Sequence, residues 1–163
     1  MSARARSPVT AAAAERLVRG VLRAEAVRHA VISVTFVGRR RIRALNARHL
    51  GRDRDTDVIA FTLSGGPPRR RPGGQRREHA SRRTGRSAGA GLPAVVGDVY
   101  VCVPVCAAQA RRFGTTAAEE VRRLLVHGLL HVLGHDHPEA GGRTAAPMWR
   151  RQERLLRRLV PHR

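Results

Sequence analysis

The chain of 163 residues has the ordinary size of one domain, and its apolar stretches are too short to cross a membrane. Its 32 basic residues are all arginine and outnumber 12 acidic residues, so the net charge of +20 favours polyanionic partners. The two cysteines, Cys102 and Cys106, are too few for a disulfide scaffold or a thiolate metal site, and we expect both to be small buried apolar residues. The first residues lack the apolar core of a signal peptide, so we expect a cytoplasmic protein.

Apolar periodicity and Gly or Pro breaks divide the chain into helices and strands. Apolar residues three or four apart mark the helices, and β-branched or aromatic runs mark the strands. In chain order, we predict a helix at about Pro8–Ala30, a strand at Val31–Gly38, a helix at Arg39–Leu50, strands at Val58–Leu63 and Val95–Val103, and helices at Pro104–Phe113, Ala117–Leu133 and Pro147–Leu159. Gly97 is predicted to form a bulge or a close approach, and Thr116 to cap the fourth helix.

These elements predict an α+β fold, because strands and helices do not alternate strictly as they do in a doubly wound sheet. We expect a small mixed β-sheet of three to four strands packed with four to five helices, one of them a zincin-like helix that carries histidines. The segment Ser64–Pro93 holds eight arginines among Gly, Pro and Ser without periodicity, which predicts a disordered basic insert at about 64–93. It is either a tolerated insertion or an extra RNA-binding arm. We expect 1–163 to form a single domain around it.

Four of the eight histidines gather in the run VHGLLHVLGHDH, Val126–His137. His127 and His131 are four residues apart, so on a helix they lie on one face. A helix that ends at Gly134 would let the chain return His137 to the other two. Three imidazoles buried together without a shared partner would leave ring nitrogens unsatisfied. We therefore predict that these three histidines bind a metal, in an open site of the zinc type that keeps a water.

The same spacing, H-x-x-x-H-x-x-G-x-x-H, is typical of metzincin peptidases, in which a Glu general base follows the first His. Here Gly128 stands at that position, and a glycine cannot take a proton from a metal-bound water. Met148 would serve as the Met-turn of a metzincin, but it fits an apolar helix face equally well. A metallopeptidase is therefore our second hypothesis.

The motif H-G-x-L-H-x-L-G-x-D-H at 127–137 resembles the signature of the bacterial YbeY family. The pair Leu45-Asn46, the run DRDTDVIAF from Asp53 to Phe61 and the triplet Gly97-Asp98-Val99 resemble further landmarks of that family in the same order. The resemblance extends over about Val31 to Leu156, apart from the basic insert.

This resemblance implies a metal-dependent hydrolase, a single-strand-specific endoribonuclease that acts in ribosomal RNA processing, in small-subunit rRNA 3′ end maturation and ribosome quality control. His127, His131 and His137 would bind Zn²⁺ or another divalent metal and act in catalysis through the metal-bound water. The implied partners are ribosomal RNA and the small ribosomal subunit with its assembly factors, with no membrane and no DNA specificity. A non-catalytic RNA-binding protein of ribosome assembly is the third hypothesis.

One departure from the family pattern concerns RNA binding. The family usually has Tyr-Arg where this chain has His49-Leu50, so its functional Arg is missing at Leu50. We expect Arg48, Arg52 and Arg54 to contact phosphates, with Arg48 or Arg52 reaching the phosphate of the missing Arg. The competing interpretation is a solvated helix face in a chain whose arginine content reflects GC-rich coding. With one Trp, one Tyr and three Phe, little aromatic surface is expected for stacking bases.

Other departures and neighbours of the motif leave alternatives open. Asp55 and Thr62 stand where the family often has proline, and the basic insert is longer than usual. His135 replaces a Tyr and is either a fourth imidazole or an exposed turn residue, which we favour. Asp136 is expected either to orient an imidazole or to cap the helix end, and Asp98 either to present a carboxylate to the site or to be an edge residue.

Overall fold

The computed structural model describes residues 6–64, 95–137 and 146–160, so the predicted insert lies outside the described residues except for Ser64. In chain order the elements are α1 (Ala11–Ala24), β1 (Ala30–Val37), α2 (Arg39–Leu50), β2 (Val58–Ser64), β3 (Val95–Cys102), α3 (Val103–Phe113), α4 (Ala117–Val132) and α5 (Pro147–Leu159). The α+β class, the mixed sheet and the helix number are as predicted. None of these described helices has both the length and the apolar character needed to span a membrane.

The central strand of the three-stranded sheet is β3, in the order β1-β3-β2. It pairs in parallel with β1 and antiparallel with β2. The register of β2 shifts between Thr62 and Ser64, and Thr62 lies opposite Gly97. The irregularity predicted at Gly97 therefore falls on the neighbouring strand.

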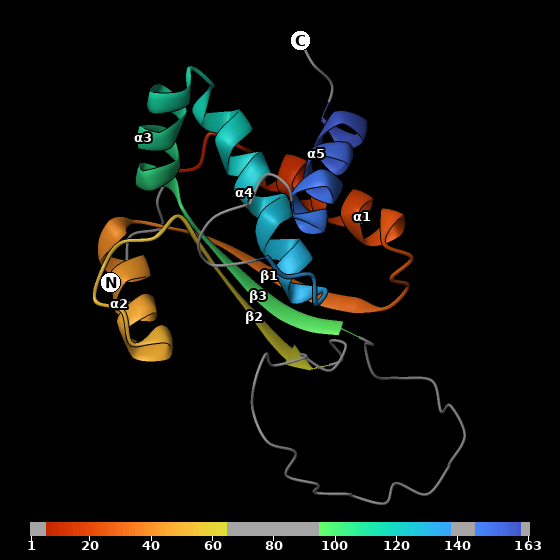
Figure 1. The fold of residues 1–163 in the computed structure, drawn as a ribbon, viewed down its shortest axis with the longest axis horizontal. Helices are drawn as coiled ribbons and strands as arrows, with labels where there is room; N and C mark the ends of the chain where they lie inside the picture. The colour runs from red at the N-terminus through yellow and green to blue at the C-terminus, as the bar shows by residue number, and fades with distance from the viewer. Residues whose placement is uncertain (1–5, 65–94, 138–145, 161–163) are drawn as a thin grey trace, which may run out of the picture.

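Two apolar cores lie on the two faces of the sheet. Side chains of α1, α4 and α5 form the larger core with Val99 and Val101 of β3. Ile42 and Leu45 of α2 form the smaller one with Ile59 of β2 on the opposite face. Figure 1 shows the same division, with α1, α4 and α5 gathered on one side of the strands and α2 on the other.

Helix α4 has defined signals at both ends. Thr116 and Glu119 form a reciprocal capping box, in which each side chain bonds to the other's backbone N–H. At the other end Gly134 has a φ of 87°. The Gly134 N–H donates to His131 O at 3.0 Å and the His135 N–H to Leu130 O at 2.9 Å, which is a Schellman motif. The predicted cap and the predicted glycine turn are both confirmed.

The prediction for the first helix was wrong at its C-terminal end. The helix stops at Ala24 rather than near Ala30, because Ala26 adopts a left-handed conformation with a φ of 56°. Ala30 then pairs with Val95 at the start of β1. A strand partner 65 residues away in the sequence decides this boundary, and local periodicity carries no information about it.

Helix α4 lies unusually close to β3 at Gly97. A Cβ atom at Gly97 would lie 2.4 Å from Val132 Cγ1 and 2.8 Å from the carbonyl oxygen of Phe61. The second neighbour is backbone and cannot rotate away. The close approach predicted at Gly97 is confirmed, and it sets the distance between the sheet and the helix that carries the histidines.

We predict that Gly97→Ala lowers the free energy of unfolding by about 1–3 kcal/mol, because an overpacked contact must push α4 away from β3. Gly38→Ala is the matched control, since a Cβ there would meet nothing within 4 Å and Gly38 has a φ of −88°. Urea unfolding of both variants measures the difference. Equal stability of the two variants would contradict this account of the packing at Gly97.

Candidate metal centre and its cleft

The three predicted histidines converge on one point. His127 and His131 project from successive turns of α4, and the turn at Gly134 returns His137 to them. The His127 Nε2 atom lies 3.1 Å from His131 Nε2 and 3.2 Å from His137 Nε2. All three rings are half-buried.

This donor set fits a tetrahedral metal ion. One nitrogen from each of the three histidines lies within 4.8 Å of the other two. Two nitrogens bound to zinc at about 2.0–2.1 Å in tetrahedral geometry are roughly 3.3 Å apart, close to the two separations above. Three imidazoles leave a fourth position open, as in catalytic rather than structural zinc sites.

Gln152 of α5 orients one of these rings. His127 Nδ1 donates to Gln152 Oε1 at 2.8 Å, and Gln152 is 1% exposed. A proton held on Nδ1 leaves Nε2 free of a proton and directed at the other two histidines, as a metal ligand requires. Sequence reasoning missed Gln152, although it stands as a polar residue in the buried stripe of Met148 and Leu155.

The environment keeps His131 uncharged. Burial, followed by the neighbouring imidazoles of His127 and His137, lowers the pKa of His131 to about 4, against a smaller opposing effect of Asp136. The ring is therefore neutral at pH 7. A neutral imidazole is the form that binds a metal, so the apo site needs no deprotonation at His131 before a metal enters.

His135 points away from the other three histidines. Its Nε2 donates to Glu25 Oε2 at 3.0 Å, and Arg151 Nε donates to Glu25 Oε1 at 2.6 Å. The Glu25 side chain is 7% exposed, so this buried carboxylate ties the end of α1 to α5 and to the turn before His137. The exclusion of His135 from the ligand set agrees with this placement. The expectation of a merely solvent-exposed turn residue was wrong.

The two aspartates singled out from the sequence lie in different places. Asp136 Oδ1 accepts from the backbone N–H of His137 at 2.8 Å and lies 3.9 Å from His131 Nδ1, beyond hydrogen-bond distance. It therefore caps the turn and adds a nearby negative charge to the site. Asp98 is not brought to the histidines, because Gly97 and Val99 face α4 and alternation along β3 turns Asp98 to the opposite side of the sheet.

Gly128 leaves no room for a peptidase base. A Cβ atom there would lie 2.7 Å from Val99 Cγ1 and 3.1 Å from Val58 Cγ2, so the position faces the sheet. A glutamate would require α4 to move away from β2 and β3. The metallopeptidase hypothesis requires a Glu at position 128. The sequence has Gly there, and the packing leaves no space for a Glu.

A cleft of about 860 Å³ extends from the histidines along α4. Its walls come from the loop after α2, from the end of α3 and from α5. Leu50, Arg52 and Arg54 line it, whereas Arg48 is exposed on α2 and is not part of its wall. Of the two candidates to replace the family's Arg at Leu50, the structure places Arg52 at the cleft.

Hydrogen bonds to α2 hold the loop that carries Arg52 and Arg54. The buried Asn46 side chain donates to Arg54 O at 2.8 Å, and the Arg52 N–H donates to Asn46 O at 3.3 Å. Asp53 accepts two bonds from Arg43, at 2.7 and 2.8 Å. Asp55, which stands where the family often has proline, accepts from Arg39 at 2.6 Å. In the run 52–55, the two aspartates therefore bind arginines of α2, and Arg52 and Arg54 line the cleft.

The cysteines lie outside the site. Cys102 and Cys106 are both fully buried and unpaired, as predicted. Burial raises the pKa of Cys106 to about 12 and also raises that of Cys102. Both thiols are therefore protonated at neutral pH and do not serve as thiolate ligands.

Comparisons with known proteins match the chain to one family and to one solved fold. The family model for Endoribonuclease YbeY matches residues 2–160. Endoribonuclease YbeY of Geobacillus kaustophilus is 36% identical over 133 residues, covering 79% of this chain and 76% of that protein. The Salinispora tropica protein of the same name is 39% identical over 128 residues, covering 78% and 73%. A solution structure from Thermotoga maritima matches with a TM-score of 0.54 at 23% identity, over 91% of this chain and 79% of the other, and supports the fold alone.

We predict that Gln152→Leu lowers zinc affinity by about 10- to 100-fold, because the His127 ring loses the acceptor that fixes its tautomer and orientation. Competition with a chromophoric chelator measures the change. Gln152→Glu keeps an acceptor and should bind zinc at least as well as the unmodified chain. Arg158→Ala, an exposed change on the same helix, is the control, and a loss of affinity equal to that of Gln152→Leu would contradict the role of Gln152.

Proposed function

The chain belongs to the YbeY family, and on that premise we propose that it is a metal-dependent endoribonuclease that cleaves single-stranded RNA. The observation that carries the proposal is the convergence of His127, His131 and His137 at a cleft whose wall also carries Arg52 and Arg54. The curated relatives are named endoribonucleases, which supports RNA as the substrate. We treat 1–163 as a single hydrolase domain.

We propose that the three histidines hold one divalent cation, and that zinc is the resident ion because three imidazoles with an open position suit it. Such a cation supplies charge to polarise a phosphoryl oxygen and lowers the pKa of bound water toward about 7. The chain's own contribution is to keep His131 neutral through burial and to orient His127 through its bond to Gln152. Gly128 supplies no base, so no protein carboxylate at that position takes part.

The grip on the substrate is assigned to Arg52 and Arg54. Both stand on the cleft wall, on a loop whose backbone is held by Asn46 and by the bonds between Asp53 and Arg43, so the loop need not be ordered when a phosphate binds. Arg48 is left out of the proposed RNA contact because it does not line the cleft. Asp136 is proposed to fix the turn that carries His137.

The dimensions of the cleft support a single strand as the substrate. Its volume of about 860 Å³ is within the range of small-ligand pockets, roughly 300–1,000 Å³, and accommodates a few nucleotides rather than a duplex. Following the family, we propose ribosomal RNA as the substrate, with the small ribosomal subunit and its assembly factors as partners, in 3′ end maturation and quality control in the cytoplasm. A metallopeptidase is not favoured, because the packing at Gly128 leaves no space for the glutamate that would act as its general base.

The central test uses His131→Ala. We expect cleavage of a single-stranded RNA to fall by more than about a hundredfold, since the loss of a ligand should exceed the 10- to 100-fold effect of an orienting partner. His29→Ala, an exposed histidine elsewhere, is the matched control and should cleave normally. Complementation of a deletion strain, with rRNA ends mapped in the same cells, completes the experiment. Full complementation by His131→Ala would favour a non-catalytic RNA-binding protein.

A second prediction distinguishes the two arginines that line the cleft from Arg48, which does not. The Arg52→Ala, Arg54→Ala double variant should raise KM for RNA and flatten its salt dependence, with the log–log slope reduced by roughly 0.7 for each phosphate that the variant no longer binds. Metal content should stay unchanged. Arg48→Ala is the matched control from the neighbouring helix and should leave both values unchanged. The assignment is wrong if Arg48→Ala weakens binding more than the double variant does.

A further inference from the structure

The five Phe, Tyr and Trp side chains of the chain divide into two groups. Phe36 packs against the larger core, and Phe61 and Tyr100 pack against the smaller one. Phe113 and Trp149 instead line the cleft. Every such ring that the cores do not use therefore stands at the proposed RNA site. Phe113 is 64% exposed, the largest fraction among the exposed large apolar side chains that the structure describes.

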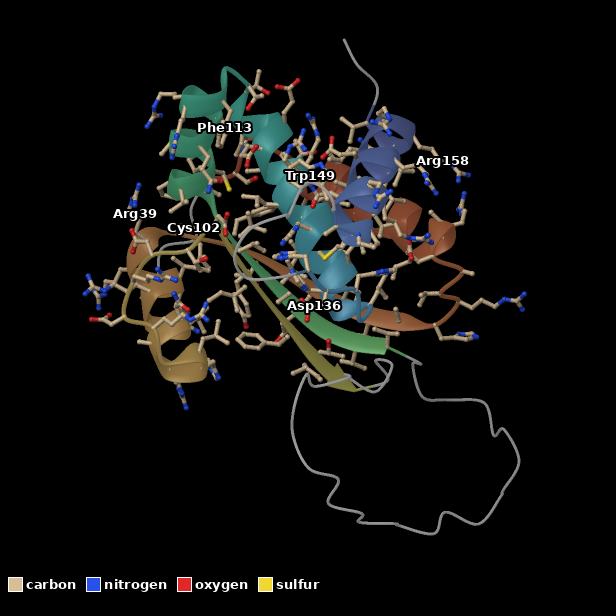
Figure 2. The ribbon with its side chains drawn as sticks, in the orientation of Figure 1. Arg39, Cys102, Phe113, Asp136, Trp149 and Arg158 are labelled. Atoms are coloured by element: carbon tan, nitrogen blue, oxygen red, sulfur yellow. The ribbon has the colours of Figure 1, made fainter. Side chains whose placement is uncertain are left out.

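These two rings stand at the end of the cleft away from the third histidine. Phe113 is the last residue of α3, just before α4 begins, and Trp149 lies in the first turn of α5. Figure 2 shows both toward the N-terminal half of α4, while Asp136 lies beyond its C-terminal end. Arg123 on the cleft wall is about 6 Å along α4 from His127, given the helical rise of 1.5 Å per residue. A strand with its phosphate at the histidines would place a neighbouring nucleotide beside these rings.

Each ring is accompanied by a guanidinium group. Arg112 lies 5.7 Å from the centroid of Phe113, and Arg123 lies 5.9 Å from the centroid of Trp149. Arg123 is held in place by ion pairs with Glu120 and Glu153. Because two carboxylates offset its charge, Arg123 serves to hold the Trp149 ring rather than to attract a phosphate. The rings themselves supply the surface on which unpaired bases stack.

We propose that Phe113 and Trp149 form a stacking site for unpaired nucleobases next to the phosphate that is cleaved. This inference rests on the proposed endoribonuclease function and supplies a physical basis for its preference for single strands. Every base has a face that can stack, so the site tolerates any sequence, whereas the faces of paired bases in a duplex are occupied. The sequence predicted little aromatic surface for stacking from the small number of rings. The structure shows that two of the five rings line the cleft.

Trp149 is the single tryptophan of the chain, so intrinsic fluorescence reports on it directly. The metal-loaded protein is mixed in a stopped-flow instrument with a single-stranded RNA oligonucleotide, and the signal is recorded before cleavage. An abasic oligonucleotide of the same length and charge is the matched ligand. Stacking predicts quenching by the first at concentrations where the second has no effect. Equal changes with both ligands, or no change with either, would overturn the proposal.

Kinetics of variants give an independent measurement. Phe113→Leu and Trp149→Leu keep apolar bulk without the ring and should each raise KM roughly five- to a hundredfold with kcat little changed. Trp149→Phe keeps a ring and should recover most of the loss. Val31→Ala changes another exposed apolar residue, on β1 and away from the cleft, and serves as the control. A fall in kcat with unchanged KM would assign these residues a structural role.

Different results would remove the endoribonuclease activity and the stacking site. RNA cleavage without base-dependent quenching of Trp149 would retain the endoribonuclease and remove the stacking site. Base-dependent quenching in a metal-loaded protein that cleaves no RNA would retain the stacking site and remove the enzyme.

Discussion

Helix α4 rests on the sheet through two glycines, Gly97 of β3 and Gly128 in the C-terminal half of α4, and the site depends on that close approach. A side chain at either position would lie less than 3 Å from an atom of the facing element. With the helix this close, Val99 packs directly beneath it and the histidine face turns away from the sheet toward the cleft. The same packing that positions the imidazoles excludes a glutamate after His127. The contact between α4 and the sheet therefore determines both where the imidazoles lie and which general base is absent.

The metal centre is assembled by elements distant in the sequence. Gln152 of α5 bonds to His127, and the adjacent Arg151 bonds to Glu25, which in turn holds His135 in the turn before His137. One helix thus supports both the first and the last of the three histidines. Gln152 is 1% exposed and the Glu25 side chain 7%, so both acceptors are held inside the protein at fixed positions.

The sequence predicted what depends on local signals. Periodicity and caps placed α4 correctly, and the spacing around Gly134 was sufficient to bring three histidines together. Contacts between distant segments were not predictable in this way, and Gln152 was missed because its partner lies 25 residues away. The choice between Arg48 and Arg52 depended on how the loop after α2 is tied down, which a single sequence does not encode as a pattern. Asp98 was predictable in principle, since strand alternation already separates it from the face of Gly97 and Val99.

The proposed chemistry depends on His127, His131 and His137 binding one metal ion together. X-ray absorption spectroscopy of the zinc-loaded protein tests this binding most directly, because the scattering identifies both the donor atoms and their distances. The expected spectrum contains the multiple scattering of three imidazoles with zinc–nitrogen distances of about 2.0–2.1 Å and a light-atom fourth ligand. A shell of sulfur at about 2.3 Å, or scattering from fewer than three imidazoles, would contradict the site described for this chain.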